Sequence, residues 1–194
     1  MIVLASASPR RQELLRNAGI PFSARAADID ETPREKESAR SLAERLAHEK
    51  ALAIFKNHPR SFVLGADTIV VVDNVTLCKP SDANDAARML RLLSGRTHIV
   101  ITGVCLVEPA VSGQLPGASK TRTASETTLV RMCEISSEEI HDYVATGEPM
   151  DKAGAYAIQG IASRWILRIE GDYSNVVGLP VALVYAMLRE AGGI

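Results

Sequence analysis

The sequence has 194 residues, with 22 Lys plus Arg against 23 Asp plus Glu and a formal net charge of -1. Hydrophobic residues make up 46% of the chain and charged residues 23%, which is typical of a soluble globular protein with one sizeable core. A chain this close to neutral lacks the broad basic field on which non-specific binding to DNA or RNA depends. We therefore expect no nucleic-acid polymer as a partner, although the charge balance permits a small basic pocket.

The cysteines and the apolar stretches of the sequence indicate the cellular compartment. Cys78, Cys105 and Cys133 are odd in number and far apart, as expected of reduced thiols rather than a disulfide framework or a zinc site. The longest apolar stretch, residues 98–107, is about half the length that a membrane helix needs. The apolar residues at the N-terminus are too few for a signal peptide. We expect a cytoplasmic protein without a membrane segment.

The first half of the chain alternates predicted strands with predicted helices. Ser8 and Pro9 are a suitable N-cap and first helical residue, and apolar spacings of three and four predict a long amphipathic helix further on. An acidic stretch at 28–37 indicates a surface loop. The predicted elements are a strand over 2–5, a helix over 9–18, a short strand near 22, a helix over 38–57 and a strand over 62–72.

The second half adds an antiparallel pair. Two long strands are joined by a Gly, Pro and Ser-rich connection at 108–119, which predicts a hairpin with a mobile loop. We expect one α/β domain over residues 1–194, with a mixed sheet and flanking helices. The predicted elements are a helix from 82 to Gly95, strands over 97–107 and 120–132, a helix over 136–146, a strand over 164–169 and a helix over 180–191.

Familiar nucleotide and hydrolase signatures are missing from the sequence. It contains no Walker P-loop, dinucleotide fingerprint, nucleophile elbow or paired histidine motif. Its four histidines are isolated from one another, as surface or hydrogen-bonded histidines usually are. Chemistry is therefore expected from other residues.

The first candidate site lies where a predicted strand meets a predicted helix, in the motif SASPRR at 6–11. A helix N-terminus presents free N–H groups and a partial positive charge, so Arg10 and Arg11 are unfavourably placed for the helix dipole. One interpretation is an oxyanion site in which Ser8, backbone amides and both arginines meet a phosphate. The other interpretation, equally compatible with the spacing, is a pair of solvated arginines.

Asp67 interrupts an apolar strand that we expect to be buried on both faces. A bare carboxylate buried there would cost several kcal/mol, so it must meet a cation, a metal or ordered water. Gly65 and Ala66 beside it are expected to leave room for a ligand. The alternative is an aspartate that pairs with a structural arginine or caps a loop.

Two lysines could serve the same site. Lys50 follows Ala43 by seven positions and Leu46 by four, which places its stem on the apolar stripe of the predicted helix. Spacing alone favours snorkelling at the helix edge over reaching into a cleft. Lys79 follows the turn after the Asp67 strand, where it either leans back toward that carboxylate or is solvated.

Two further segments carry polar groups of interest. Glu31 lies in the acidic loop and is either a metal ligand or a hydrated side chain. The segment 151–160 packs two charges, glycines and an amide into ten residues. Gln159 could read the edge of a base because an amide both donates and accepts hydrogen bonds. The alternative is a turn whose glycines satisfy backbone angles.

Taken together, the motifs resemble the Maf family of nucleoside triphosphate pyrophosphatases over nearly the whole chain and in the right order. The resemblance implies an elongated α/β fold with a cleft between two lobes, related to that of the inosine triphosphate pyrophosphatases. The matching motifs are SASPRR at 6–11, GADTIV at 65–70, KP at 79–80, DKAGAYAIQG at 151–160 and VGLP at 177–180.

The same resemblance assigns roles to residues of this sequence. It implies that Asp67 is the catalytic proton acceptor and that Glu31 and Asp67 lie at a divalent metal, with magnesium expected first and manganese or cobalt as alternatives. Substrate-binding residues are expected at Ser8, Arg11, Lys50, Lys79 and Lys152. Base selectivity is expected from Arg10, Thr68 and Gln159.

The three selectivity positions also indicate a branch of the family. One branch has Trp before a single Arg, Gln after the catalytic Asp and Ser-Glu-Gly in place of Ile-Gln-Gly, and prefers methylated GTP. This sequence has the other set and is similar to the branch acting on dTTP and UTP, with CTP or modified pyrimidine nucleotides as further candidates. We expect hydrolysis to the nucleoside monophosphate and pyrophosphate, and homodimerisation is a further candidate property. The alternative is a nucleotide-binding regulator of septum formation or cell division with little turnover.

Overall fold

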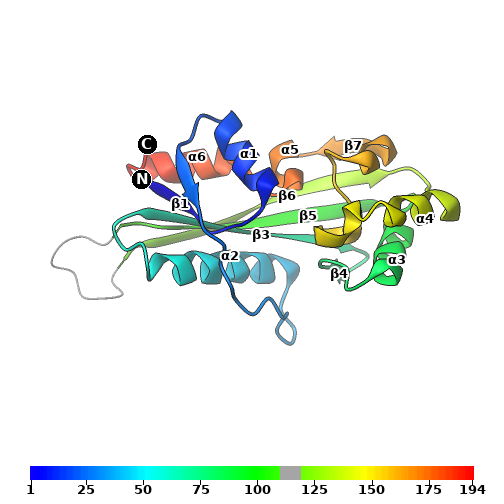
Figure 1. The fold of residues 1–194 in the computed structure, drawn as a ribbon, viewed down its shortest axis with the longest axis horizontal. Coiled ribbons are helices and arrows are strands. Elements are labelled where there is room, and N and C mark those ends of the chain that lie inside the picture. Colours follow the sequence, from blue (N-terminus) through cyan, green and yellow to red (C-terminus); the bar gives the residue numbers. More distant parts are fainter. Residues whose placement is uncertain (110–118) are drawn as a thin grey trace.

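The computed structural model describes residues 1–109 and 119–194 (Figure 1). The predicted mobile loop at 108–119 falls largely on residues 110–118 and so lies outside the described part of the chain. The described residues form an elongated α/β structure around one sheet (Figure 1).

The sheet is mixed, as predicted. Its strand order is β2-β1-β3-β5-β6-β7, with β4 paired to β3. The β1 strand runs parallel to β2 and β3, whereas the remaining pairs are antiparallel. The strands are β1 (Ile2–Leu4), β2 (Phe22–Ala24), β3 (Phe62–Val72), β4 (Val75–Leu77), β5 (Thr97–Val107), β6 (Thr121–Met132) and β7 (Ile166–Glu170).

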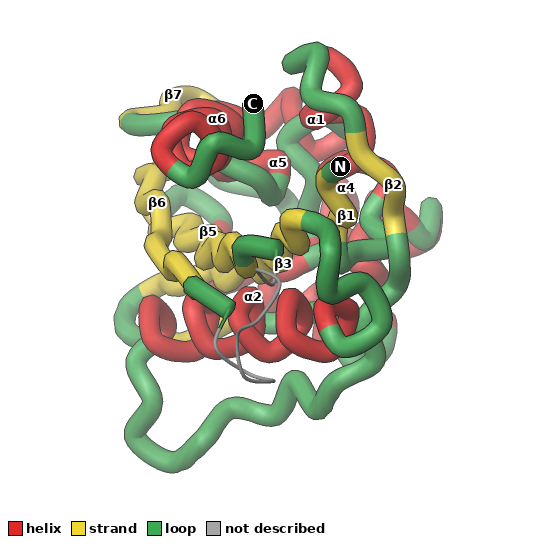
Figure 2. The backbone as a smooth tube through the Cα atoms, turned by 90° about the vertical axis from the view of Figure 1, so that its left-hand side faces the viewer, coloured by secondary structure: helices red, strands yellow, loops and turns green. Residues whose placement is uncertain are grey.

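Helices cover both faces of the sheet. The long α2 lies on one face, while α1, α5 and α6 lie on the opposite side (Figures 1 and 2). Side-chain alternation along β3 explains this division, since Val63 packs on α2 while Leu64 joins a cluster with α1 and α6. The helices are α1 (Pro9–Asn17), α2 (Ala39–Phe55), α3 (Ala83–Leu93), α4 (Ser137–Ala145), α5 (Tyr173–Val177) and α6 (Val181–Glu190).

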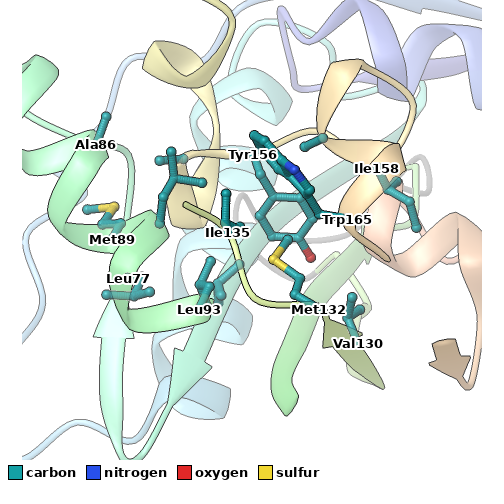
Figure 3. Packing of buried hydrophobic residues seen from close by; sticks show 14 of the residues in the cluster. Leu77, Ala86, Met89, Leu93, Val130, Met132, Ile135, Tyr156, Ile158 and Trp165 are labelled. Carbon is teal, nitrogen blue, oxygen red and sulfur yellow. The ribbon is translucent and has the colours of Figure 1, made fainter. Parts of the chain in front are cut away.

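A separate apolar cluster packs α3, α4 and the segment after them against the far ends of β3 and β5 (Figure 3). Tyr143 and Trp165 meet edge to face there, with ring centroids 5.2 Å apart. Tyr156 and Ile158 belong to the same cluster and also line the cavity described below. Aromatic packing therefore gives one wall of that cavity a rigid support.

Glycines let α2 approach the sheet closely. A Cβ at Gly65 would lie 2.1 Å from the Ala47 carbonyl oxygen, and one at Gly103 would lie 2.3 Å from the Ala43 carbonyl oxygen. The expectation that Gly65 and Ala66 leave room for a ligand is therefore wrong. The space beside Gly65 is filled by the α2 backbone, and Ala66 is fully buried.

The region after residue 147 differs most from the sequence prediction. The strand predicted over 164–169 begins at Ile166, because residues Ile161–Trp165 form a 3-10 helix. Short 3-10 helices also occupy Glu148–Asp151 and Ala153–Ala155, where a loop was expected. The unpredicted α5 has five residues, too few to show a helical period, and is capped by the Asp172 side chain.

Candidate functional site

The candidate site lies at an open stretch of the β3 edge. The β1 strand pairs with β3 only as far as Leu64, and β4 pairs with it only from Val70 onward. The Leu64 carbonyl accepts a hydrogen bond from the Ala5 amide, so backbone groups two and four residues further on, at Ala66 and Thr68, face the same edge. Among the described strands, none pairs with this stretch of the edge.

A cavity of about 410 Å³ opens at this edge. Its volume is in the range of sites that hold small molecules. Every site residue predicted from the sequence lines it, although these residues come from six separate stretches of the chain. They are Ser8, Arg10, Arg11, Glu31, Lys50, Asp67, Thr68, Lys79, Lys152 and Gln159.

The cavity gathers positive charge in a chain that is close to neutral. Its lining includes three acidic side chains, of which two were predicted and the third is Asp151. Five basic side chains face them, namely Arg10, Arg11, Lys50, Lys79 and Lys152. An excess of cations in a concave site attracts small anions while the remaining surface stays balanced.

Lys50 is buried between two carboxylates. Its Nζ lies 2.5 Å from Oδ1 of Asp67 and 2.6 Å from Oε1 of Glu31. The Lys50 and Asp67 side chains are only 8% and 11% exposed. Spacing alone favoured a snorkelling lysine, and this interpretation is wrong, because the close approach of α2 to β3 directs the ammonium into the cavity.

Glu31 connects this pair to Lys79, whose Nζ lies 3.5 Å from Oε2 of Glu31. Burial disfavours the charged form of Glu31, but the hydrogen bonds and charges of Lys50 and Lys79 outweigh it and lower its pKa. Lys79 thus reaches the carboxylate cluster through Glu31. The acidic loop at 28–37 holds a charged group at the cavity rather than a merely hydrated one.

Arg11 is held from three sides at the start of α1. Its Nε donates to the Gly178 carbonyl at 2.7 Å, and its Nη2 donates to Oγ1 of Thr68 at 3.0 Å. A longer bond of 3.4 Å joins Nη1 to Oγ of Ser6. Burial lowers the pKa of Arg11, with Asp67 opposing the effect, and the guanidinium nevertheless stays charged. The interpretation of two solvated arginines is therefore wrong for Arg11.

Ser8 caps α1, and its hydroxyl accepts from the Arg11 amide at 3.5 Å. Ser8 and the first helical residues, Pro9 to Arg11, all line the cavity, so the N-terminus of α1 lies at it. The arrangement matches the oxyanion-site interpretation, in which hydroxyl, amide and guanidinium groups face one anion.

Arg10, Lys152 and Gln159 also line the cavity. Arg10 lies 3.6 Å from Asp151, an ion pair that is partly exposed. Lys152 donates to Oδ1 of Asp151 at 2.5 Å and to the Glu148 carbonyl at 2.7 Å. Gln159 is exposed at the rim. Arg10 and Lys152 thus meet at the Asp151 carboxylate.

Sequence reasoning missed the support behind Thr68. Its hydroxyl lies 3.0 Å from Oγ1 of Thr102, which donates to the Asn175 carbonyl at 3.0 Å. The Asn175 amide in turn donates to the Val100 carbonyl. These residues are far apart along the chain, so local patterns contain no signal for them. The VGLP motif at 177–180 contributed to the family resemblance, but no role was predicted for the Gly178 carbonyl that accepts from Arg11.

The fold is that of a mixed α/β protein, and the cavity at its β3 edge brings five basic and three acidic side chains together. A family model described as Maf-like protein matches residues 1–191. A dTTP/UTP pyrophosphatase of Koribacter versatilis is 55% identical over 191 residues, which cover 98% of this chain and 94% of that protein. A dTTP/UTP pyrophosphatase of Symbiobacterium thermophilum is 50% identical with the same coverage. The chain therefore belongs to the Maf-like protein family.

The solved structure of the Staphylococcus aureus Ham1 protein covers 97% of this chain and 98% of its own, at 13% identity and a TM-score of 0.45. That likeness is too weak to carry an argument. Separately, none of the described helices is both long and apolar enough to span a membrane.

Proposed function

We propose that this protein is a nucleoside triphosphate pyrophosphatase that hydrolyses dTTP and UTP to the nucleoside monophosphate and pyrophosphate. The observation that carries the proposal is the cavity, in which five basic side chains from separate stretches of the chain come together with the Asp67 carboxylate. Relatives named dTTP/UTP pyrophosphatase, at 55% and 50% identity over nearly the full chain, support the substrate class. CTP and modified pyrimidine nucleotides remain candidate substrates.

Asp67 is the proton acceptor in this proposal. Water attacks a phosphorus of the anhydride between the α and β phosphates, the bridging P–O bond breaks, and the proton of the water passes to the Asp67 carboxylate. Arg11, Lys50 and Lys79 offset the charge that develops on the bridging and leaving oxygens. Fixed charges aimed at the reacting groups contribute strongly to such a reaction because they need no reorganisation.

A divalent cation, with magnesium the first candidate and manganese or cobalt the alternatives, fits the carboxylates of Glu31 and Asp67. Both face the same Lys50 ammonium, within 2.5 and 2.6 Å. The described residues contain no cluster of three or more acidic, His or Cys side chains that would hold a metal alone. Magnesium is commonly held by one or two carboxylates together with substrate phosphates, which suits this pair. When bound, such a cation neutralises phosphate charge.

Base selectivity is assigned to Arg10, Thr68 and Gln159. Thr68 and Gln159 supply hydroxyl and amide groups to the cavity, and the Arg10 guanidinium adds hydrogen-bond donors. Ser8 and Lys152 complete the substrate-binding set.

The described cysteines are free thiols, which supports a reducing, cytoplasmic compartment. Homodimerisation stays a prediction.

Pyrophosphate release across a panel of nucleoside triphosphates, with and without magnesium, tests the proposal. We expect dTTP and UTP to be the preferred substrates and turnover to need the cation. The alternative, a nucleotide-binding regulator with little turnover, predicts binding of the same nucleotides without pyrophosphate release. The relatives' names do not favour that alternative.

A further inference from the structure

Glu148 lies beneath the turn that carries Gln159. It is the first residue of the short 3-10 helix that follows α4, and its side chain is half-buried. Its Oε1 accepts from the Ile161 amide at 3.1 Å, and Oε2 lies 3.3 Å from the same nitrogen. The carboxylate thus binds the backbone two residues beyond Gln159.

The same carboxylate is anchored from the core. The Tyr143 hydroxyl donates to Oε1 of Glu148 at 2.9 Å, and Tyr143 is 1% exposed. Burial and the nearby Glu148 charge both raise the pKa of Tyr143, so the hydroxyl keeps its proton and remains a donor. Tyr143 packs edge to face on Trp165, which fixes the position of the hydroxyl.

Gly160 shows how closely the carboxylate fits the turn. A Cβ built at Gly160 would lie 2.1 Å from Oε1 of Glu148 and 2.6 Å from its Cδ. The backbone φ of Gly160 is -102°, which any residue can adopt, so the requirement for glycine here is one of space. The Glu148 carboxylate occupies the volume that a side chain at position 160 would need.

We propose that Glu148 is a positioning residue for nucleobase recognition, because its carboxylate holds the turn at 159–161 so that Gln159 faces the base. The inference rests on the proposed function, in which Gln159 reads the base and the cluster around Lys50 and Asp67 binds phosphate. Glu148 itself is absent from the cavity lining. It acts through the turn rather than on the substrate.

Two ligands distinguish positioning from general support of the fold. UTP engages both the residues assigned to the base and the residues assigned to the phosphates. Inorganic tripolyphosphate carries no base and therefore tests the phosphate-binding residues alone. Glu148→Ala is expected to raise KM for UTP about tenfold, which corresponds to about 1.4 kcal/mol. The inhibition constant of tripolyphosphate against UTP hydrolysis is expected to stay within about twofold of the wild-type value.

Matched variants complete the experiment. Glu148→Gln keeps an acceptor oxygen for the Ile161 amide and is expected to restore most of the UTP affinity. Glu138→Ala removes an exposed carboxylate of α4 and should behave as wild type. If Glu148→Ala fails to fold, Gly160→Ala displaces the turn with Glu148 intact and should give the same selective loss for UTP.

The outcomes separate this inference from the proposed function. An unchanged KM for UTP in Glu148→Ala, or an equal weakening of UTP and tripolyphosphate, would overturn the positioning role. A wild-type protein that releases no pyrophosphate from any nucleotide of the panel would instead overturn the proposed function. In that case direct binding of UTP and tripolyphosphate to the same variants still tests the role of Glu148.

Discussion

Replacing Lys50 by methionine tests the buried charge cluster most severely. The variant keeps an unbranched apolar stem but leaves Asp67, 11% exposed, without the ammonium that lies 2.5 Å from it. Removing one partner of a buried ion pair costs about 3 to 5 kcal/mol, because the remaining charge is desolvated and unpaired. For a chain of this size each kcal/mol corresponds to about 2–4 °C, so we expect the melting temperature to fall by roughly 6 to 20 °C.

The double variant Lys50→Met/Asp67→Asn tests whether the loss of stability comes from the unpaired Asp67 charge. It removes both charges of the buried pair, while Glu31, 43% exposed, remains solvated. Replacing both partners by neutral groups is often close to neutral in free energy, so the double variant should unfold at a higher temperature than Lys50→Met alone. Thermal and urea unfolding followed by far-UV circular dichroism provide the measurement. The reasoning would be refuted if Lys50→Met were as stable as wild type, or if the double variant were less stable than Lys50→Met.

Three further results are expected. Gly65→Ala places a Cβ 2.1 Å from the Ala47 carbonyl oxygen, so α2 must shift, with a loss of about 1 to 3 kcal/mol in urea unfolding and slower pyrophosphate release. Burial lowers the pKa of His98 to about 4, so between pH 6.5 and 4 only the unfolded chain binds a proton there. Stability should therefore fall with decreasing pH across that window, by about 3 kcal/mol at 1.36 kcal/mol per pKa unit, and His98→Gln should remove this part of the slope. Arg11→Lys keeps the charge but loses the fork that binds Thr68, and kcat/KM should drop about tenfold or more.

Each of these results has its own control. Gly193→Ala is matched to Gly65→Ala, because its Cβ would come no closer than 3.2 Å to its neighbours. The pH profiles of wild type and His98→Gln are compared at equal ionic strength, and identical slopes between pH 6.5 and 4 would contradict the buried neutral imidazole. Wild-type kcat/KM in Arg11→Lys would show that charge alone, without the hydrogen-bonded geometry, is sufficient.

The sequence indicated the individual groups of the cavity better than their arrangement. Asp67 stood out because it interrupts an apolar strand, and the local signals for the α1 N-cap at Ser8 were confirmed. The direction of Lys50 could not be read from helical spacing, because it depends on how closely α2 approaches β3. That distance is set by Gly65 and by Gly103 on a different strand, which becomes a neighbour only in the folded sheet.

Non-local hydrogen bonds explain the other gaps. The support of Thr68 by Thr102 and of Arg11 by Gly178 joins residues 34 and 167 positions apart. The role inferred for Glu148 similarly depends on Tyr143 and Ile161 meeting at one carboxylate. A pattern within one segment of the sequence cannot predict hydrogen bonds between residues so far apart along the chain. Motifs in the right order indicated the family, whereas the hydrogen bonds behind them form only in the folded chain.

The central claim is that Asp67 accepts the proton of the attacking water in a pyrophosphatase reaction. Asp67→Asn keeps the shape of the side chain, and Lys50 retains Glu31 at 2.6 Å, so the fold should persist. Pyrophosphate release from dTTP and UTP with magnesium, compared between Asp67→Asn and wild type, measures the claim most directly. We predict rapid release by wild type and a loss of about 100-fold or more in the variant. Near-wild-type release by Asp67→Asn would contradict the account.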